Sequence, residues 1–218
     1  MKAAVIFDID GTLIDSNGAH AESFSRVFDK YGKQIPPDEL KWLMGMGADK
    51  IMKIYLSDEQ IDAFGDDLKM NRRRMFLDEY LPKVKTVPRL RELFERLKAD
   101  NKQIVLASSA SDQEIEQYKK LMNISDLIEE ETSSDDAGKS KPDPDIFEAA
   151  FEKLRAVDKD AAVIIGDTPY DAEAAQKVGI EIYGVESGGW SREKLSGAGC
   201  KRVFRDIGEI YDRYAELF

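Results

Sequence analysis

The feature that most constrains the fold is a short apolar run that ends in acidic residues. Residues 3–7 favour a buried strand, and the chain continues as Asp8-Ile9-Asp10-Gly11-Thr12. Residues two apart on a strand point the same way, so Asp8 and Asp10 are expected to face one space if the strand persists that far. In an open parallel sheet, the space beyond the strand ends is where ligands bind. The same residues also fit a plain Asp-Gly turn with solvated carboxylates.

Strand and helix patterns alternate from Pro88 to the end of the chain. Buried strands are predicted at residues 103–107, 162–165 and 181–185, with shorter ones at 127–128 and 202–204. Between them lie helical stripes that open at cap or first-turn residues, namely Pro88, Ser111, Pro144, Asp171 and Asp206. This alternation predicts an α/β fold: a Rossmann-like, doubly wound parallel sheet with helices on both faces.

The stretch between the first two strands is far too long for an ordinary loop. It has its own helical patterns, including an apolar face within residues 17–31 and a capping box that begins at Ser57 and opens a long helix toward Tyr80. We therefore expect two domains. Residues 1–15 and 86–218 form the α/β core, and residues 16–85 form an inserted, all-helical cap.

Charge and composition exclude several classes of partner. The net charge of -11 argues against nucleic acid and anionic membrane surfaces. No apolar run is long enough to span a membrane, and the start of the sequence lacks a signal-peptide pattern. The single cysteine, Cys200, fits a reducing, cytoplasmic setting, and one histidine with one cysteine excludes an ordinary zinc site. Both a monomer and a homodimer remain open.

Three further segments bring polar residues to the same edge of the expected sheet. The strand at 103–107 leads to Ser108 and Ser109. Lys141 stands beside two prolines that follow it, just ahead of a helix, and the strand at 162–165 leads to Asp167 and then Asp171. Each has a plain role taken alone: serines in turns, a surface lysine, aspartates as helix caps. Together they point to chemistry, because four crowded carboxylates need a cation, and Mg²⁺ prefers such oxygen ligands. A lysine and a serine hydroxyl suit the oxygens of a phosphoryl group.

These motifs, in this order, resemble the four motifs of the haloacid dehalogenase superfamily. They are Asp8-Ile9-Asp10-Gly11-Thr12, Ser108, Lys141-Pro142 and Gly166-Asp167-Thr168-Pro169-Tyr170-Asp171. The helical insertion resembles the cap of phosphoglycolate phosphatase and β-phosphoglucomutase relatives. The resemblance covers the whole core and is highly specific, because motif and context agree.

The resemblance implies a role for each core residue. Asp8 would be the nucleophile that takes the phosphoryl group, and Asp10 would be the general acid and then the general base. Ser108 and Lys141 would bind the transferring phosphoryl group. Mg²⁺ would be held by Asp8, by the backbone carbonyl of Asp10 and by Asp167, with Asp171 as a direct ligand or just behind one.

In the cap, residues 44–50 are the expected specificity loop, and a plain inter-helix turn is an equal alternative. Gly47 and Lys50, with Ser109 of the core, would then contact substrate. His20 matches a histidine that relatives often have at the cap entrance, but a surface or capping role fits it equally well. Trp190 receives no role. The run 72–74 is interpreted as a solvated helix face, although one of its arginines could instead bind an anion.

The predicted function is a Mg²⁺-dependent phosphatase that hydrolyses a small phosphorylated metabolite through an aspartyl-phosphate. The alternative is a β-phosphoglucomutase-like sugar-phosphate mutase, which would need a second anion site such as an arginine of residues 72–74. Haloacid dehalogenation ranks lower, because the founding dehalogenases have no aspartate where this chain has Asp10. A non-enzymatic phosphoacceptor domain would lack both the helical insertion and the motif from Gly166 to Asp171.

Overall fold

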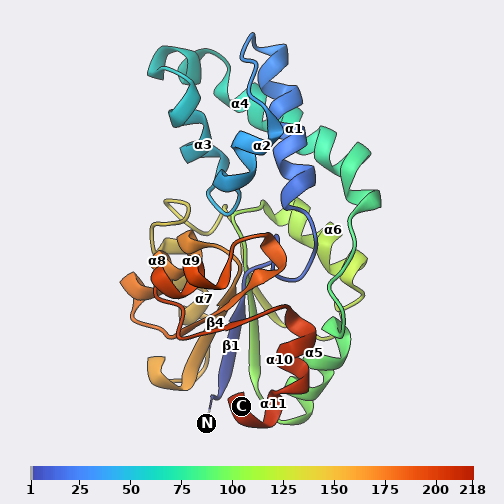
Figure 1. Cartoon of the computed structure of the whole chain (residues 1–218), viewed down its shortest axis with the longest axis vertical. Coiled ribbons are helices and arrows are strands. Elements are labelled where there is room, and N and C mark those ends of the chain that lie inside the picture. Colours follow the sequence, from blue (N-terminus) through green and yellow to red (C-terminus); the bar gives the residue numbers. More distant parts are fainter. Residues whose placement is uncertain (1) are drawn as a thin grey trace.

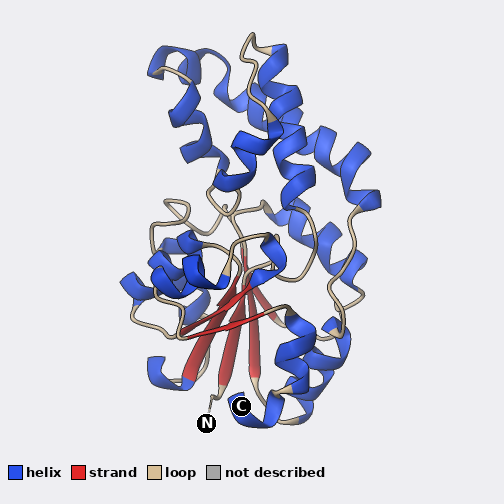
Figure 2. Ribbon diagram, viewed as in Figure 1, coloured by secondary structure: helices blue, strands red, loops and turns tan. Residues whose placement is uncertain are grey.

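The computed structural model describes residues 2–218. In that range, six strands form one parallel sheet in the order β3-β2-β1-β4-β5-β6. The strands are β1 (Ala4–Phe7), β2 (Gln103–Ala107), β3 (Glu130–Thr132), β4 (Ala162–Gly166), β5 (Ile182–Val185) and β6 (Arg202–Phe204). Helices cover both faces (Figure 2), so the predicted doubly wound, Rossmann-like α/β fold is confirmed.

The register of the three central strands brings the polar segments together. Phe7 of β1 lies beside Leu106 of β2 and Ile165 of β4. The carboxyl ends of these strands are therefore almost level. The residues that follow them, Asp8, Ser108 and Asp167, consequently emerge at one edge of the sheet.

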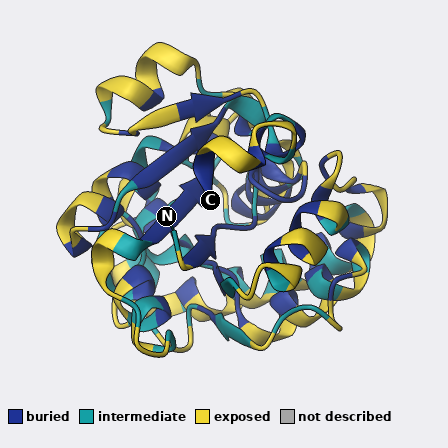
Figure 3. Cartoon of the chain, turned by 90° about the horizontal axis from the view of Figure 1, so that it is seen from below, coloured by how far each residue is buried: buried dark blue, intermediate teal, exposed yellow. Residues whose placement is uncertain are grey.

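Alternate residues of β1 are buried on opposite faces of the sheet. Val5 and Phe7 belong to the hydrophobic cluster under α5 (Leu90–Ala99), α6 (Asp112–Met122), α10 (Ile207–Asp212) and α11 (Tyr214–Leu217). Ala4 and Ile6 belong to the cluster under α7 (Asp145–Glu152), α8 (Pro169–Val178) and α9 (Arg192–Gly197). Burial on both faces explains the unbroken apolar run of β1. Figure 3 shows the buried strands at the centre and the exposed outer sides of the helices around them.

Four helices between β1 and α5 share a third hydrophobic cluster: α1 (Asn17–Lys30), α2 (Pro37–Leu40), α3 (Ala48–Tyr55) and α4 (Asp58–Met75). The capping box at Ser57 opens α4, as its sequence indicates. The chain then passes through a π-helical turn, Phe76–Tyr80, and a 3₁₀ turn, Leu81–Lys83. In Figure 1 these helices stand beyond the edge of the sheet to which the central strands lead. We propose that they form the cap domain, within the boundaries expected from the sequence.

The structure differs from the predicted elements in three places. The strand expected at 127–128 lies instead at Glu130–Thr132, because Leu127 and Ile128 pack against the core from a connecting turn without joining the ladder. The expected loop at 44–50 becomes helical from Ala48, the start of α3. Helix α9 was not predicted. Within residues 2–218, no helix combines the length and apolar character needed to cross a membrane.

Candidate active site

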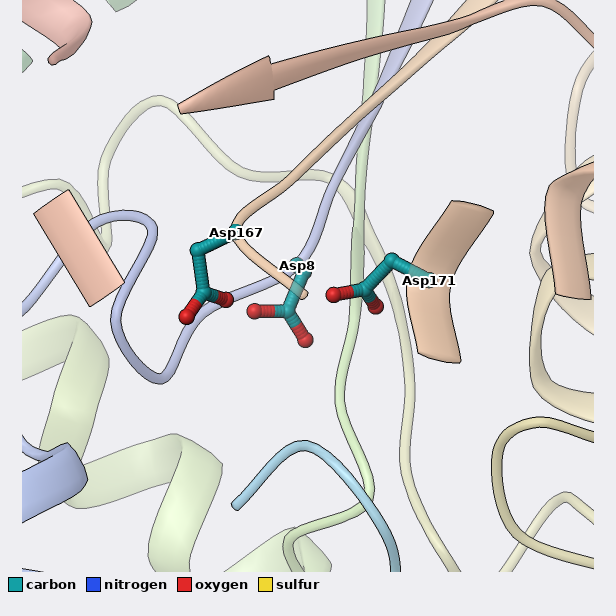
Figure 4. Close-up of side chains that lie close together, drawn as sticks. All are labelled: Asp8, Asp167 and Asp171. Atoms are coloured by element: carbon teal, nitrogen blue, oxygen red, sulfur yellow. The ribbon is translucent and has the colours of Figure 1, made fainter. Parts of the chain in front are cut away.

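Three aspartates from two sheet-edge segments meet in one buried cluster. One carboxylate oxygen of each of Asp8, Asp167 and Asp171 lies within 4.8 Å of the others, and all three residues are buried. Figure 4 shows the three carboxyl groups together, with Asp8 between the other two in that view. The loops after β1 and β4 supply Asp8 and Asp167, and the first turn of α8 supplies Asp171.

Lys141 is the cation of this cluster. Its Nζ lies 2.5 Å from Asp8 Oδ1 and 2.8 Å from Asp171 Oδ1, and the residue is fully buried. Burial alone would lower the pKa of Lys141, but Asp171 and Asp8 together raise it, so the ammonium group stays charged. The alternative that Lys141 is an ordinary surface lysine is therefore wrong.

The cluster carries more negative charge than Lys141 can offset. Three ionised carboxylates and one ammonium would leave two negative charges in a buried site. Burial raises the pKa of Asp8 to about 7 despite Lys141, and burial with the charge of Asp8 raises the pKa of Asp167 well above its ordinary value. A divalent cation bound by oxygen would relieve this repulsion, so the donor set fits Mg²⁺.

Two polar residues without a sequence-predicted role hold Asp167 in place. Asn17 Nδ2 donates to Asp167 Oδ2 at 2.9 Å. Thr12 Oγ1 lies 3.2 Å from Asp167 Oδ1 and 3.0 Å from Asp8 Oδ2. A Cβ atom at Gly11 or Gly188 would come within 2.2 or 1.7 Å of Asp167 Oδ2, so glycine is required beside this carboxylate.

Asp10 takes its hydrogen-bond partners from outside the cluster. Its Oδ1 accepts hydrogen bonds from Ser16 Oγ at 2.6 Å and from His20 Nε2 at 2.8 Å. Burial raises the pKa of Asp10, but the interactions with His20 and Ser16 outweigh it and lower the pKa. The strand ends at Phe7 and does not persist to Asp10, so the two carboxylates take different partners. Both still line one small cavity of about 60 Å³.

His20 connects Asp10 to the helices above the sheet. Its ring stacks on Phe76 with centroids 3.9 Å apart, and Arg72 NH1 lies 3.1 Å from its Nδ1. Because arginine only donates hydrogen bonds, Nδ1 must accept here, and Nε2 then carries the proton donated to Asp10. Tyr118 Oη lies 3.4 Å from the same Nε2. His20 is buried, so the alternative of a surface histidine is wrong.

Arg72 and Arg73 turn toward the core and meet one buried carboxylate. Arg72 NH2 lies 3.1 Å from Glu114 Oε1, and Arg73 Nε lies 3.5 Å from Glu114 Oε2. Arg74 is exposed and Arg73 is partly exposed, so the interpretation as a solvated face is wrong for Arg72, which is largely buried. The sequence could not reveal this contact, because Glu114 reads as a plain capping-box residue of α6, a role that it also fills.

Of the remaining predicted site residues, some line a cavity at the site and others do not. Ser108 lines the small cavity beside Asp8, and its Oγ accepts a hydrogen bond from the Ala110 backbone N–H at 3.0 Å. Ser109 and Gly47 line this cavity and also a second, larger cavity beside it. Lys50 pairs with Asp143 and lines neither. Trp190 packs edge-on against Trp42 with centroids 4.9 Å apart.

Four residues of the site were missed as functional candidates: Thr12, Asn17, Glu114 and Tyr118. Arg72 was named only as one of three arginines that could bind an anion. Thr12 was noted only as part of the first motif, and Glu114 only as a cap. The position of Asn17 in the first turn of a helix is the one available signal, and it indicates a cap as readily as a ligand.

Known proteins share both the sequence pattern and the architecture. The profile of the family described as haloacid dehalogenase-like hydrolase matches residues 5–185. The chain is 29% identical to the phosphorylated carbohydrates phosphatase of Thermotoga maritima, over 84% of each chain. It is 26% identical to the phosphoglycolate phosphatase of Rhodospirillum rubrum, over 97% of this chain and 90% of that one.

Solved structures of related proteins share the fold of the whole chain. The crystal structure of a hydrolase from Pseudomonas syringae superimposes with a TM-score of 0.86 at 25% identity, over 99% of both chains. A protein from Thermotoga maritima described as a putative β-phosphoglucomutase superimposes with a TM-score of 0.72 at 27% identity, over the full length of both.

Proposed function

Because the chain belongs to the haloacid dehalogenase-like hydrolase family, we propose that it uses Mg²⁺ and a phosphorylated Asp8 to hydrolyse a small phosphate monoester. Its curated relatives include phosphatases of phosphorylated carbohydrates and of phosphoglycolate, and the chain is itself a hydrolase of the phosphatase type. The proposed setting is the cytoplasm, as a monomer or a homodimer, with no nucleic-acid or membrane partner.

The observation that carries the proposal is the contact between Asp8 and Lys141 inside the carboxylate cluster. In the first step, an oxygen of Asp8 attacks phosphorus, and the bond from phosphorus to the leaving oxygen breaks. Asp10 must be protonated before this step, and it gives that proton to the leaving alcohol. In the second step, Asp10 takes a proton from water, which attacks the same phosphorus, releases inorganic phosphate and restores Asp8. Lys141 and Ser108 bind the non-bridging oxygens.

The metal would be held by the carboxylates of Asp8 and Asp167 and by the backbone carbonyl of Asp10. When bound, Mg²⁺ would offset negative charge on the phosphoryl oxygens. Asp171 would act from behind these ligands, since its Oδ2 already accepts from the Thr168 backbone N–H and hydroxyl, at 3.0 and 2.6 Å. Its Oδ1 lies against Lys141, so we expect it to fix that ammonium group.

A sugar-phosphate mutase is the second candidate, favoured by the similarity to the protein described as a putative β-phosphoglucomutase. Both enzymes would form the same phosphorylated aspartate. A mutase must then admit a sugar hydroxyl in preference to water, which requires a second anion site. Arg72, which lines the cavity with Asp8 and Asp10, and its neighbour Arg73 are already paired with Glu114. That pairing supports hydrolysis.

A screen of phosphate monoesters for released phosphate tests the proposal. Activity should require Mg²⁺, disappear with excess chelator and be absent from Asp8→Asn. Incubation with β-glucose 1-phosphate and a trace of β-glucose 1,6-bisphosphate separates the candidates. Hydrolysis should release phosphate with little glucose 6-phosphate, whereas rapid isomerisation without phosphate release would establish the mutase.

A further inference from the structure

A larger cavity opens beside the reacting carboxylates. It measures about 370 Å³, within the usual range of roughly 300–1,000 Å³ for small-molecule sites. It shares five lining residues with the small cavity that holds Asp8 and Asp10, namely Gly47, Ala48, Arg72, Ser109 and Glu114. A phosphate ester bound at Asp8 would therefore extend its leaving group into this space.

The charges that line this cavity balance. Three cationic side chains, Lys69, Arg72 and Arg73, stand with three anionic ones, Asp49, Glu114 and Asp135. The two arginines share the buried Glu114. A leaving group with its own carboxylate or second phosphate would have to approach that carboxylate or displace it, and like charges without water are costly.

Four buried polar atoms in the lining of the larger cavity make no well-formed hydrogen bond, although Glu114 Oε1 and Arg73 Nε take part in ion pairs. They are Nε of Arg72, Nε of Arg73, Oε1 of Glu114 and Oγ of Ser109. The set contains donors, an acceptor and a hydroxyl, and buried polar groups of this kind are costly to leave unpaired. A ligand hydroxyl both donates and accepts, so a polyol can satisfy both kinds of atom. An ionised carboxylate or phosphate only accepts, so it could bind the Nε–H groups of the arginines but could not donate a hydrogen bond to Glu114 Oε1.

The rest of the lining agrees with a polyol. Ser111, Ser134 and Ser140 add further hydroxyl groups. Within the described residues, the lining of this cavity includes no aromatic side chain on which a nucleobase or a flavin ring could stack. The apolar contribution is small, from Ala48, Ala137 and Ile146.

From these observations we infer that the substrate is the phosphate monoester of a sugar or polyol whose leaving group carries no charge, and that Glu114 sets this preference by pairing with both Arg72 and Arg73. The inference rests on the proposed phosphatase function and narrows it.

Matched substrate pairs test the preference in the wild-type enzyme. Glycerol 3-phosphate and 3-phosphoglycerate differ in a hydroxymethyl against a carboxylate group, and fructose 6-phosphate and fructose 1,6-bisphosphate differ in a second phosphate. We expect kcat/KM to be higher for the uncharged member of each pair, on the order of tenfold or more. A preference for the anionic members would overturn the inference and leave the phosphatase intact. If even p-nitrophenyl phosphate is not cleaved, the proposed function itself fails.

Variants of Glu114 and Arg73 test the charge balance. Glu114→Gln keeps the shape and the capping role of the side chain, because glutamine also serves in a capping box. It leaves the cavity with one excess positive charge, Arg73→Gln leaves one excess negative charge, and the double variant restores the balance. Arg74→Gln, at the exposed neighbour, is the control.

The ratio of kcat/KM for 3-phosphoglycerate to that for glycerol 3-phosphate should follow the net charge. It should rise about tenfold or more in Glu114→Gln, fall in Arg73→Gln, and return near the wild-type value in the double variant and in the control. If every variant lost kcat/KM equally on both substrates, so that the ratio did not change, the role of Glu114 would be refuted. If Glu114→Gln does not fold, the comparison of wild type with Arg73→Gln decides.

Discussion

Asp8 and Asp10 stand two residues apart in the chain and meet different partners. Asp8 contacts Lys141 inside the carboxylate cluster, whereas Asp10 is held by Ser16 and His20. A nucleophile needs to lie beside the groups that bind the phosphoryl oxygens, and an acid needs a neighbour that fixes its orientation. The separation of the two environments supports the proposed division of labour.

His20 is proposed to position Asp10, and the nature of the leaving group can reveal that role. An alkyl phosphate needs a proton on its departing oxygen, whereas p-nitrophenyl phosphate has a good leaving group and needs it less. His20→Gln should therefore lower kcat about tenfold or more for an alkyl phosphate and clearly less for p-nitrophenyl phosphate, given the 10²–10⁴-fold that general acid–base catalysis contributes. Equal losses on both substrates would show that His20 does not act through the proton of Asp10.

The cap helices and the core meet through a few polar contacts near the site. Ser140 Oγ donates to Asp49 Oδ1 at 2.6 Å, and Tyr170 Oη donates to the Trp42 carbonyl at 2.9 Å. Gly47 lies at the same junction, and a Cβ atom there would come within 2.3 Å of Ser140 Cβ. We propose that close approach of α3 to the core is part of forming the active site.

Gly47→Ala tests this junction. The added methyl group should hold the cap away from the core and lower kcat/KM about tenfold or more, since small misplacements are costly in catalysis. Gly18→Ala in α1 is the control: a Cβ atom there has no neighbour within 4 Å, so activity should be unchanged, with stability raised by up to about 1 kcal/mol. Wild-type kcat/KM in Gly47→Ala would contradict the proposal; thermal denaturation would show that both variants fold.

Strands and helices could be predicted from the sequence where a local residue pattern determines them. The strands β1, β2 and β4 are apolar runs bounded by polar residues, and the capping boxes at Ser57 and Ser111 gave helix starts. Strand β3 was misplaced because burial of Leu127 and Ile128 does not require ladder pairing. The contact between Arg72 and Glu114 could not be predicted, because the two residues are 42 positions apart on different helices. The hydrophobic pattern of the sequence does not specify how those helices pack.

For the molecule as a whole, the buried cluster at the sheet edge links metal binding to stability. Asp8 and Asp167 repel each other in a site that a divalent cation would neutralise. A ligand that binds only the native state stabilises it by about 2.7 kcal/mol at 100 times its Kd. For a chain of this length, that is a rise in Tm of roughly 5–10 °C.

Thermal unfolding with Mg²⁺ or with chelator measures this link without an activity assay. The wild-type Tm should rise with Mg²⁺. Asp167→Asn should raise the Tm in chelator, because it removes a buried like-charge contact, and should abolish the response to Mg²⁺. A wild-type Tm that does not change with Mg²⁺, together with full activity in excess chelator, would be incompatible with the metal site.

Trapping the phosphorylated enzyme tests the central claim, that Asp8 takes the phosphoryl group and water removes it. In Asp10→Asn the nucleophile is intact and the base that activates water is lost. Exposure to acetyl phosphate and Mg²⁺, followed by rapid quenching and peptide mass spectrometry, should therefore show phosphoryl on the peptide that contains Asp8. The label should be absent from Asp8→Asn. Phosphorylation of a different residue, or turnover by Asp8→Asn, would contradict the account.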